Sequence, residues 1–265
     1  MPDFERHHIV PFAISYDAVD VLTAFAAKQH ITYTLLSDEG SKVIRELGLL
    51  NEDVYGHHAA YGVPKRDHHW GVPYPGVFLL DEQGRVMQRR FQQSYRERET
   101  GVAVLERGFG LASSVHGAPA HAEGHGIRVA ARLDSPTYRA FQRLWLMIDI
   151  DIDAGLHVYG QPIPEGFIPL TVDITPAEGR SVGTPEFPPP TPHRFEGLDE
   201  EFYIYEGKLT VTQPLTFIDD ADDAMVQVVV RYQACSDALG CLMPQTVTLQ
   251  VPVRVQDHVD RPRQR

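Results

Sequence analysis

The chain has 265 residues, of which 43% are hydrophobic, and its formal net charge is −12 at pH 7. This length suits two domains, and the charge argues against nucleic acid and anionic membranes as partners, because a phosphate-binding face needs clustered Lys and Arg. No segment approaches the roughly 18–20 uninterrupted apolar residues of a membrane span, and no secretory signal is visible at the N-terminus. Two cysteines are too few to identify a redox compartment.

The first hundred residues predict an α/β layer. Short apolar runs typical of strands alternate with segments in which apolar residues recur at helical spacing. Asp17 is a suitable N-cap for the first helix, and Gly48 is suited to end the second. The predicted elements are a strand at 8–16, a helix at 17–29, an extended segment at 31–36, a helix at 38–47, and a hairpin formed by 76–81 and 85–91.

This order of elements carries a family resemblance. With the segments SYDAVDVLTAFAAKQHITYTLLSDEGSKVIRELGLLN and VPYPGVFLLDEQGRV, it resembles the redoxin branch of the thioredoxin-like fold, the peroxiredoxin (AhpC/TSA) superfamily, over about residues 8–100. Pro75 stands just before the Phe-Leu-Leu-Asp strand, where that superfamily commonly has a proline. In thioredoxin relatives this proline is cis and faces the reactive cysteine, so the resemblance implies both features for Pro75.

The chain departs from the redoxin pattern at its reactive end. A redoxin begins with a strand and a helix whose N-terminus carries the attacking cysteine. Both elements are absent here, and the first cysteine is Cys235, so we expect no peroxidase activity. The missing strand would leave two facing sheet edges with unpaired backbone groups. Either the sheet is split, or another segment fills the gap, or the start at Met1 truncates a longer protein, which is the favoured alternative.

A histidine-rich loop and three aspartates offer candidate metal ligands. The pairs His57-His58 and His68-His69 would suit zinc or copper, but adjacent histidines point in different directions, so exposed loop residues are the preferred interpretation. Asp149, Asp151 and Asp153 match part of a calcium loop. The glycine and glutamate of that signature are missing, and the intervening isoleucines fit a strand with a solvated face. We therefore expect neither a metal nor another cofactor.

The second half of the chain predicts a β-rich domain. The segment 106–126 contains a run rich in Gly, Ala and Ser that suits a linker. Strands are predicted at 127–133 and 140–152, and the proline run 185–193 reads as a stiff loop between strands or, alternatively, as a polyproline ligand.

The segment 226–255 contains Cys235 and Cys241, the two cysteines of the chain. Apolar residues alternate with polar ones on both sides of the connection between them, which predicts a β-hairpin. A hairpin brings the cysteines close to the Cα separation of about 4.4–6.8 Å that a disulfide requires. A reversible cystine is the simplest chemistry for the pair. A purely structural disulfide and two unrelated buried thiols remain alternatives.

This hairpin resembles a known redox element. It resembles the cysteine hairpin in the N-terminal domain of DsbD, the bacterial thiol:disulfide interchange protein. The resemblance rests on the sequence YQAC, a spacing of five residues, the sequence CLMPQT and the alternating strand that follows. The resemblance covers roughly residues 126–256 and includes DAGLHVY and IYEGKLTV. It implies an immunoglobulin-like sandwich whose cysteine pair passes electrons to partner proteins. It also implies a loop that caps the pair, a role that we assign to residues 194–201 with Phe195.

Two further residues are expected to support the cysteines. Asp237 lies in the hairpin connection, and a carboxylate there would raise the pKa of the thiols. Tyr232 is expected to pack beside the pair. The predicted organisation is an incomplete α/β thioredoxin-like domain at 1–105, a linker at 106–126, an all-β immunoglobulin-like sandwich at 127–257, and a disordered tail at 258–265.

The predicted function is thiol–disulfide exchange by Cys235 and Cys241, with a protein thiol or disulfide as partner and a peroxidase-inactive redoxin-like domain. The alternative is a non-enzymatic interaction or scaffold protein in which the cystine is only a staple. A staple should have a reduction potential below about −300 mV, and an exchanger a higher one. We expect the periplasm if a longer precursor carries a signal, and otherwise the cytoplasm. The sequence does not fix the oligomeric state.

Overall fold

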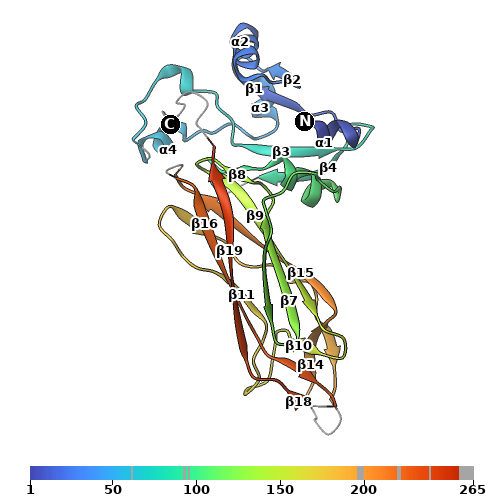
Figure 1. Ribbon diagram of the computed structural model, residues 1–265. Helices are drawn as coiled ribbons and strands as arrows, with labels where there is room; N and C mark the ends of the chain where they lie inside the picture. The colour runs from blue at the N-terminus through green and yellow to red at the C-terminus, as the bar shows by residue number, and fades with distance from the viewer. Residues whose placement is uncertain are drawn as a thin grey trace. The chain divides into compact units, whose positions relative to one another are not determined.

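The computed structural model describes residues 1–60, 62–91, 94, 96–195, 200–219, 222–238 and 240–256. These residues form two compact units (Figure 1). The N-terminal unit contains residues 1–98 and 108–112, and the C-terminal unit contains residues 99–107 and those from 113 onward. The tail predicted at 258–265 lies outside the described residues.

The N-terminal unit contains helices and strands in the predicted order, but they do not form one sheet. β1 and β2 pair in parallel, and β3 and β4 pair antiparallel as the predicted hairpin. In the described part of this unit no strand joins the two pairs, so the sheet is split, and a complete thioredoxin-like sheet is not formed. The elements are α1 (Pro2–Arg6), β1 (Phe12–Ser15), α2 (Val19–Gln29), β2 (Thr34–Ser37), α3 (Lys42–Glu46), α4 (Val54–Ala60), a 3₁₀ turn (Asp67–His69), β3 (Gly76–Leu80) and β4 (Val86–Phe91).

Two local expectations for the N-terminal unit are corrected. The helix predicted at 38–47 begins at Lys42 as α3. Asp38 precedes it, and the Asp38 carboxylate accepts hydrogen bonds from the backbone N–H groups of Val43 and Ile44. The cis bond implied at Pro75 is wrong. The cis peptide bond found among the described residues is Gln161–Pro162, in the other unit.

The C-terminal unit is built almost entirely of strands. Short elements lead into it: β5 (Arg98–Glu99), α5 (Gly101–Ala103) and a π-helical turn (Val104–Phe109). The strands that follow are β6 (Ala120–Gly124), β7 (Ile127–Leu133), β8 (Thr137–Tyr138), β9 (Gln142–Ile152), β10 (His157–Tyr159), β11 (Thr171–Ile174), β12 (Arg180–Val182), β13 (Thr191–His193), β14 (Phe202–Glu206), β15 (Lys208–Phe217), β16 (Ala224–Tyr232), β17 (Ala234–Ser236), β18 (Gly240–Cys241) and β19 (Gln245–Val255).

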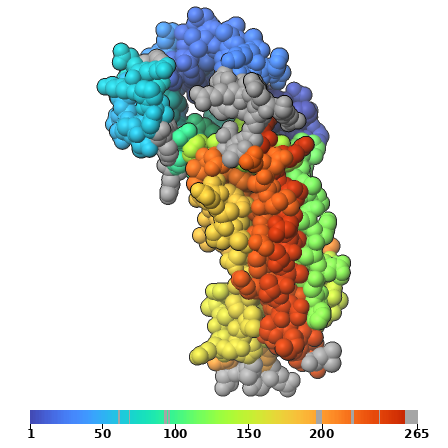
Figure 2. Space-filling model, turned by 60° about the vertical axis from the view of Figure 1, so that its left-hand side comes forward, coloured from blue at the N-terminus to red at the C-terminus, as the bar shows by residue number. Residues whose placement is uncertain are grey.

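Two antiparallel layers enclose the core of this unit. One runs in the order β12-β15-β9-β7-β6, and the other contains β11-β16-β19, with β8 added in parallel at its edge. In Figure 2, β19 (red) and β16 (orange) run side by side along one face of the unit. Inward residues of both layers, such as Ile148 and Ile150 on β9 and Leu249 and Val251 on β19, belong to one buried cluster. The alternation of each strand therefore produces a β-sandwich.

The outward face of β9 explains the aspartate run. Asp149 pairs with Arg132 at 2.5 Å, and Arg128 pairs with Asp151 at 3.2 Å and Asp153 at 2.8 Å. These carboxylates are partly or well exposed, as expected for the solvated face of a strand. The strand interpretation of 140–152 is thus confirmed over β9.

Part of the segment predicted as a linker at 106–126 is strand instead. β6 pairs antiparallel with β7, with His121 opposite Ala130. Ala120 and Ala122 pack against the core, whereas His121 and Glu123 are exposed. The small residues that indicated a linker here supply the inward face of an edge strand.

Among the described residues, no helix has both the length and the apolar character needed to cross a bilayer.

A buried carboxyl group links the start of the C-terminal unit to its sheet. Asp134 is 1% exposed. Its side chain accepts a hydrogen bond from the hydroxyl of Thr100 at 2.5 Å and another from the backbone N–H of Trp145 at 3.0 Å. Burial raises the pKa of Asp134 to about 6, against the lowering effect of these two donors. The stability of this unit should therefore depend on pH through Asp134.

Candidate functional site

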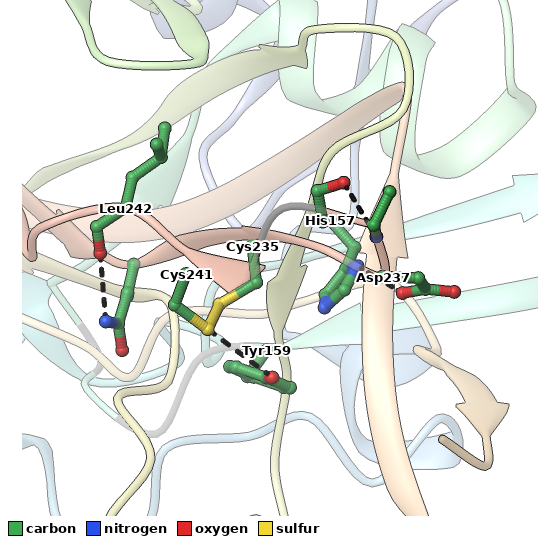
Figure 3. The surroundings of a disulfide bond; sticks show 9 residues. His157, Tyr159, Cys235, Asp237, Cys241 and Leu242 are labelled. Atoms are coloured by element: carbon green, nitrogen blue, oxygen red, sulfur yellow. Dashed lines mark hydrogen bonds and ion pairs between the residues drawn. A yellow bond between two sulfur atoms is a disulfide. The ribbon is translucent and has the colours of Figure 1, made fainter. Parts of the chain in front are cut away.

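The predicted cysteine hairpin is present. β16 and β19 pair antiparallel with Val230 opposite Val247, and the chain continues from β16 into the short pair β17 and β18. There Cys235 lies directly opposite Cys241, and the two form a disulfide with an S–S distance of 2.06 Å (Figure 3). Their Cα atoms are 3.9 Å apart, closer than the expected range of about 4.4–6.8 Å.

Strand β10 places two side chains beside the disulfide. β10 lies between β14 and β17 in a separate five-stranded sheet. Its pairing with β17 places His157 opposite Cys235, and its pairing with β14 places Tyr159 opposite Ile204. Because side chains alternate along a strand, His157 and Tyr159 share one face of β10. The register of β10 therefore brings both side chains to the cysteine pair.

The two sulfur-bearing residues differ in exposure. Cys235 is 2% exposed, whereas Cys241 is exposed. The hydroxyl group of Tyr159 lies 3.9 Å from the Sγ atom of Cys241. Burial, followed by the charge of Asp237, raises the pKa of Tyr159, so this hydroxyl stays protonated at neutral pH. Of the two residues, Cys241 is therefore the one open to solvent, and it lies beside a hydrogen-bond donor.

Aromatic side chains cover the buried side of the disulfide. Cys235, Tyr159 and Phe202 form a small buried cluster, against which Phe195 and Phe167 pack while remaining partly exposed. The ring of Phe195 lies 5.0 Å from that of Phe202 and 6.2 Å from that of Tyr159, measured between centroids. Phe195 thus lies beside the cluster that contains Cys235, and its role as a cap residue stays a prediction. Residues 196–199 of the proposed cap lie outside the described residues.

Asp237 bridges two histidines at the site. One of its carboxylate oxygens lies 3.6 Å from Nδ1 of His157, and the other lies 3.7 Å from Nε2 of His193. Asp237 itself is exposed, whereas His157 is 3% exposed. Burial lowers the pKa of His157, and the charge of Asp237 opposes that effect. His157, Tyr159 and His193 were not predicted as site residues, although the alternation in Leu156–Tyr159 was visible in the sequence.

Two other predicted supporting residues, Tyr232 and Pro75, are not members of the small cluster that contains Cys235. Tyr232 belongs to the main core of the sandwich and donates a hydrogen bond from its hydroxyl to the backbone carbonyl of His125 at 3.1 Å. Burial raises its pKa to about 12. It therefore supports the sandwich rather than the small cluster that contains Cys235. Pro75 belongs to the N-terminal unit, whereas the site is built from the C-terminal unit.

In the histidine-rich loop, the rings of His58 and His69 lie next to each other. Nδ1 of His58 lies 3.1 Å from Nδ1 of His69, and His57 contacts Asn51 at the same distance. Within the described ranges, no group of three or more His, Cys, Asp or Glu side chains is arranged to hold a metal ion.

Two family models match the chain. Residues 132–252 match the family described as thiol:disulfide interchange protein DsbD, N-terminal, and residues 1–89 match the AhpC/TSA family. Both resemblances predicted from the sequence are thus confirmed, and together with the Cys235–Cys241 disulfide they support the thiol–disulfide interchange class. The comparison with curated proteins gave no significant match.

Solved structures similar to the chain include two N-terminal domains. The N-terminal periplasmic domain of ScsB from Proteus mirabilis is 15% identical with a TM-score of 0.37, over 57% of this chain and 53% of that domain. The chain thus spans about half of the length of that structure. The reduced N-terminal domain of DsbD from Neisseria meningitidis is 15% identical with a TM-score of 0.30, over 41% of this chain and 77% of that domain. A complex of DsbD and PilB N-terminal domains from Neisseria meningitidis is 14% identical with a TM-score of 0.31, over 50% of this chain and 80% of that one.

Proposed function

We propose that this protein exchanges electrons with a protein thiol or disulfide through Cys235 and Cys241. The observation that carries the proposal is the unequal exposure of the two residues, with Cys241 exposed and Cys235 buried under aromatic side chains. A purely structural cystine does not require one sulfur to be presented beside a buried hydroxyl group. Redoxin-type chemistry is not expected of the N-terminal unit, since residues 1–89 match the AhpC/TSA family without containing a cysteine.

The unequal exposure of Cys235 and Cys241 supports one order of exchange steps. When the pair is oxidised, a partner thiolate attacks Sγ of Cys241, the Cys235–Cys241 bond breaks, and Cys235 leaves as a thiolate. A second partner thiolate then displaces Cys241 from the mixed disulfide. The partner becomes a disulfide, and the pair becomes two thiols after taking up two protons. The same steps in reverse pass electrons from the pair to a partner disulfide.

Phe195 is proposed to restrict access to the disulfide. Its partly exposed ring packs on the small cluster around Cys235, 5.2 Å from the ring of His157. Phe195→Ala should therefore speed reduction of the pair by dithiothreitol by about threefold or more, because exchange rates depend on access to the attacked sulfur. Reduction is followed by alkylation of the freed thiols and mass spectrometry.

Phe187→Ala is the matched control. Phe187 is also partly buried in the C-terminal unit, but it packs on the main core and stacks on Tyr205, with 6.4 Å between ring centroids. It should leave the reduction rate unchanged. Equal reduction rates for wild type and Phe195→Ala would refute the cap role of Phe195. They would not contradict thiol–disulfide exchange by Cys235 and Cys241.

A further inference from the structure

His157 lies across from Cys235, the buried cysteine of the pair. The register of β10 and β17 places it directly opposite Cys235, and side chains at facing positions of paired strands have Cβ atoms about 4.5–5.5 Å apart. In Figure 3 the ring of His157 lies between the carboxylate of Asp237 and the disulfide. An imidazole in this position is within reach of Cys235.

One nitrogen of this ring has no partner in the described part of the chain. Nε2 of His157 is buried and makes no hydrogen bond there, whereas Nδ1 faces Asp237 at 3.6 Å. A buried nitrogen without a partner costs free energy, so such a group calls for a functional explanation. In the tautomer whose proton is on Nδ1, which faces Asp237, Nε2 is a free acceptor.

Charged and titratable groups on several neighbouring elements influence the pKa of His157. Burial lowers its pKa, Asp237 and Glu206 raise it, and His193 lowers it. The imidazole is therefore neutral at neutral pH, and the Asp237 carboxylate would stabilise an imidazolium formed during reaction. The facing groups are Tyr159 on β10, Cys235 on β17, Glu206 on β14, His193 on β13, and Asp237 in the connection after β17.

We propose that His157 is the general base that removes the proton from the Cys235 thiol when the reduced pair closes to a disulfide. This inference rests on the exchange function proposed above. Once Cys241 has formed a mixed disulfide with a partner, His157 takes the Cys235 proton. The resulting thiolate attacks Sγ of Cys241, the Cys241–partner bond breaks, and the partner leaves as a thiolate. The pair is oxidised, the partner is reduced, and the imidazolium releases its proton to solvent.

A two-step probe separates this proton transfer from the initial attack. The reduced full chain is mixed with dithiobis(nitrobenzoate). Attack by Cys241 releases one coloured thionitrobenzoate, and attack by Cys235 on the mixed disulfide releases a second. In His157→Gln the first release should keep its rate, and the second should slow by at least about tenfold near neutral pH. The second release in wild type should also level off at a lower pH than in His157→Gln.

Two further variants complete the test. His121→Gln changes an exposed histidine on β6 and should leave both releases unchanged. Asp237→Asn keeps His157 but removes the carboxylate that stabilises its cation, and should slow the second release with little effect on folding, because Asp237 is exposed. If His157→Gln does not fold, Asp237→Asn decides the question.

The outcomes distinguish the inference from the function on which it rests. A second release with the same rate and pH profile in wild type, His157→Gln and Asp237→Asn would overturn the role of His157 and leave exchange intact. A wild-type protein that never closes its disulfide with this probe would overturn the exchange function itself.

Discussion

Cys235→Ser, which keeps the exposed Cys241, is expected to accumulate as a stable mixed disulfide when it is mixed with a disulfide such as oxidised glutathione. Cys241→Ser should form this adduct about a hundredfold more slowly, because its remaining sulfur is buried beneath aromatic rings, where burial also disfavours the thiolate. Both variants should lose multiple-turnover exchange, since no second sulfur remains to resolve the intermediate. Intact-mass measurement of the adduct over time gives both rates.

The comparison is internally controlled because each variant keeps one thiol of the same pair. Modification under denaturing conditions should be equal in the two variants, which shows that the difference lies in the fold. Faster capture of Cys235 than of Cys241 in the native proteins would reverse the order of steps proposed here. Equal and slow capture of both would indicate a sealed, structural cystine.

The largest expected effect on stability involves Asp134. Its pKa is raised from 3.8 to about 6 on folding, so the folded state binds a proton more tightly than the unfolded state does. This contribution is complete below the unfolded value and is lost as the pH rises through about 6. The corresponding loss in the free energy of unfolding is on the order of 3 kcal/mol.

Asp134→Asn isolates this contribution. The amide is neutral at all pH values, so the difference in unfolding free energy between wild type and the variant should shift against wild type between about pH 4 and about pH 7. Urea unfolding at several pH values measures it. Asp173→Asn, which removes an exposed carboxylate paired with Arg231 at 2.9 Å, is the control and should show no such shift. A pH-independent difference for Asp134→Asn would refute the effect.

The sequence alone predicts the cysteine hairpin and the long core strands, since alternation is a local signal. Val226–Tyr232 and Val247–Val255 alternate on both sides of the cysteine pair, and the structure pairs them as β16 and β19. The same alternation predicts the bounds of β7 and β9 to within a few residues. The match of residues 132–252 to the DsbD N-terminal family confirms what those motifs indicated.

The rest of the site depends on contacts that sequence spacing does not show. His157 meets Cys235 through the register of β10 on β17, across more than seventy residues of chain. Tyr232 lies only three residues before Cys235, yet the alternation of β16 turns it into the main core. β6 resembles a linker in composition because an inward strand face made of alanine carries no strong apolar signal.

The reduction potential of the Cys235–Cys241 pair tests the exchange function most directly. The oxidised protein is equilibrated with thiol–disulfide buffers of known potential, and the reduced fraction is measured after acid quenching and alkylation. An exchangeable pair should have a potential above about −300 mV. A potential below that value, with no disulfide transfer to a protein partner, would show that the cystine is a staple.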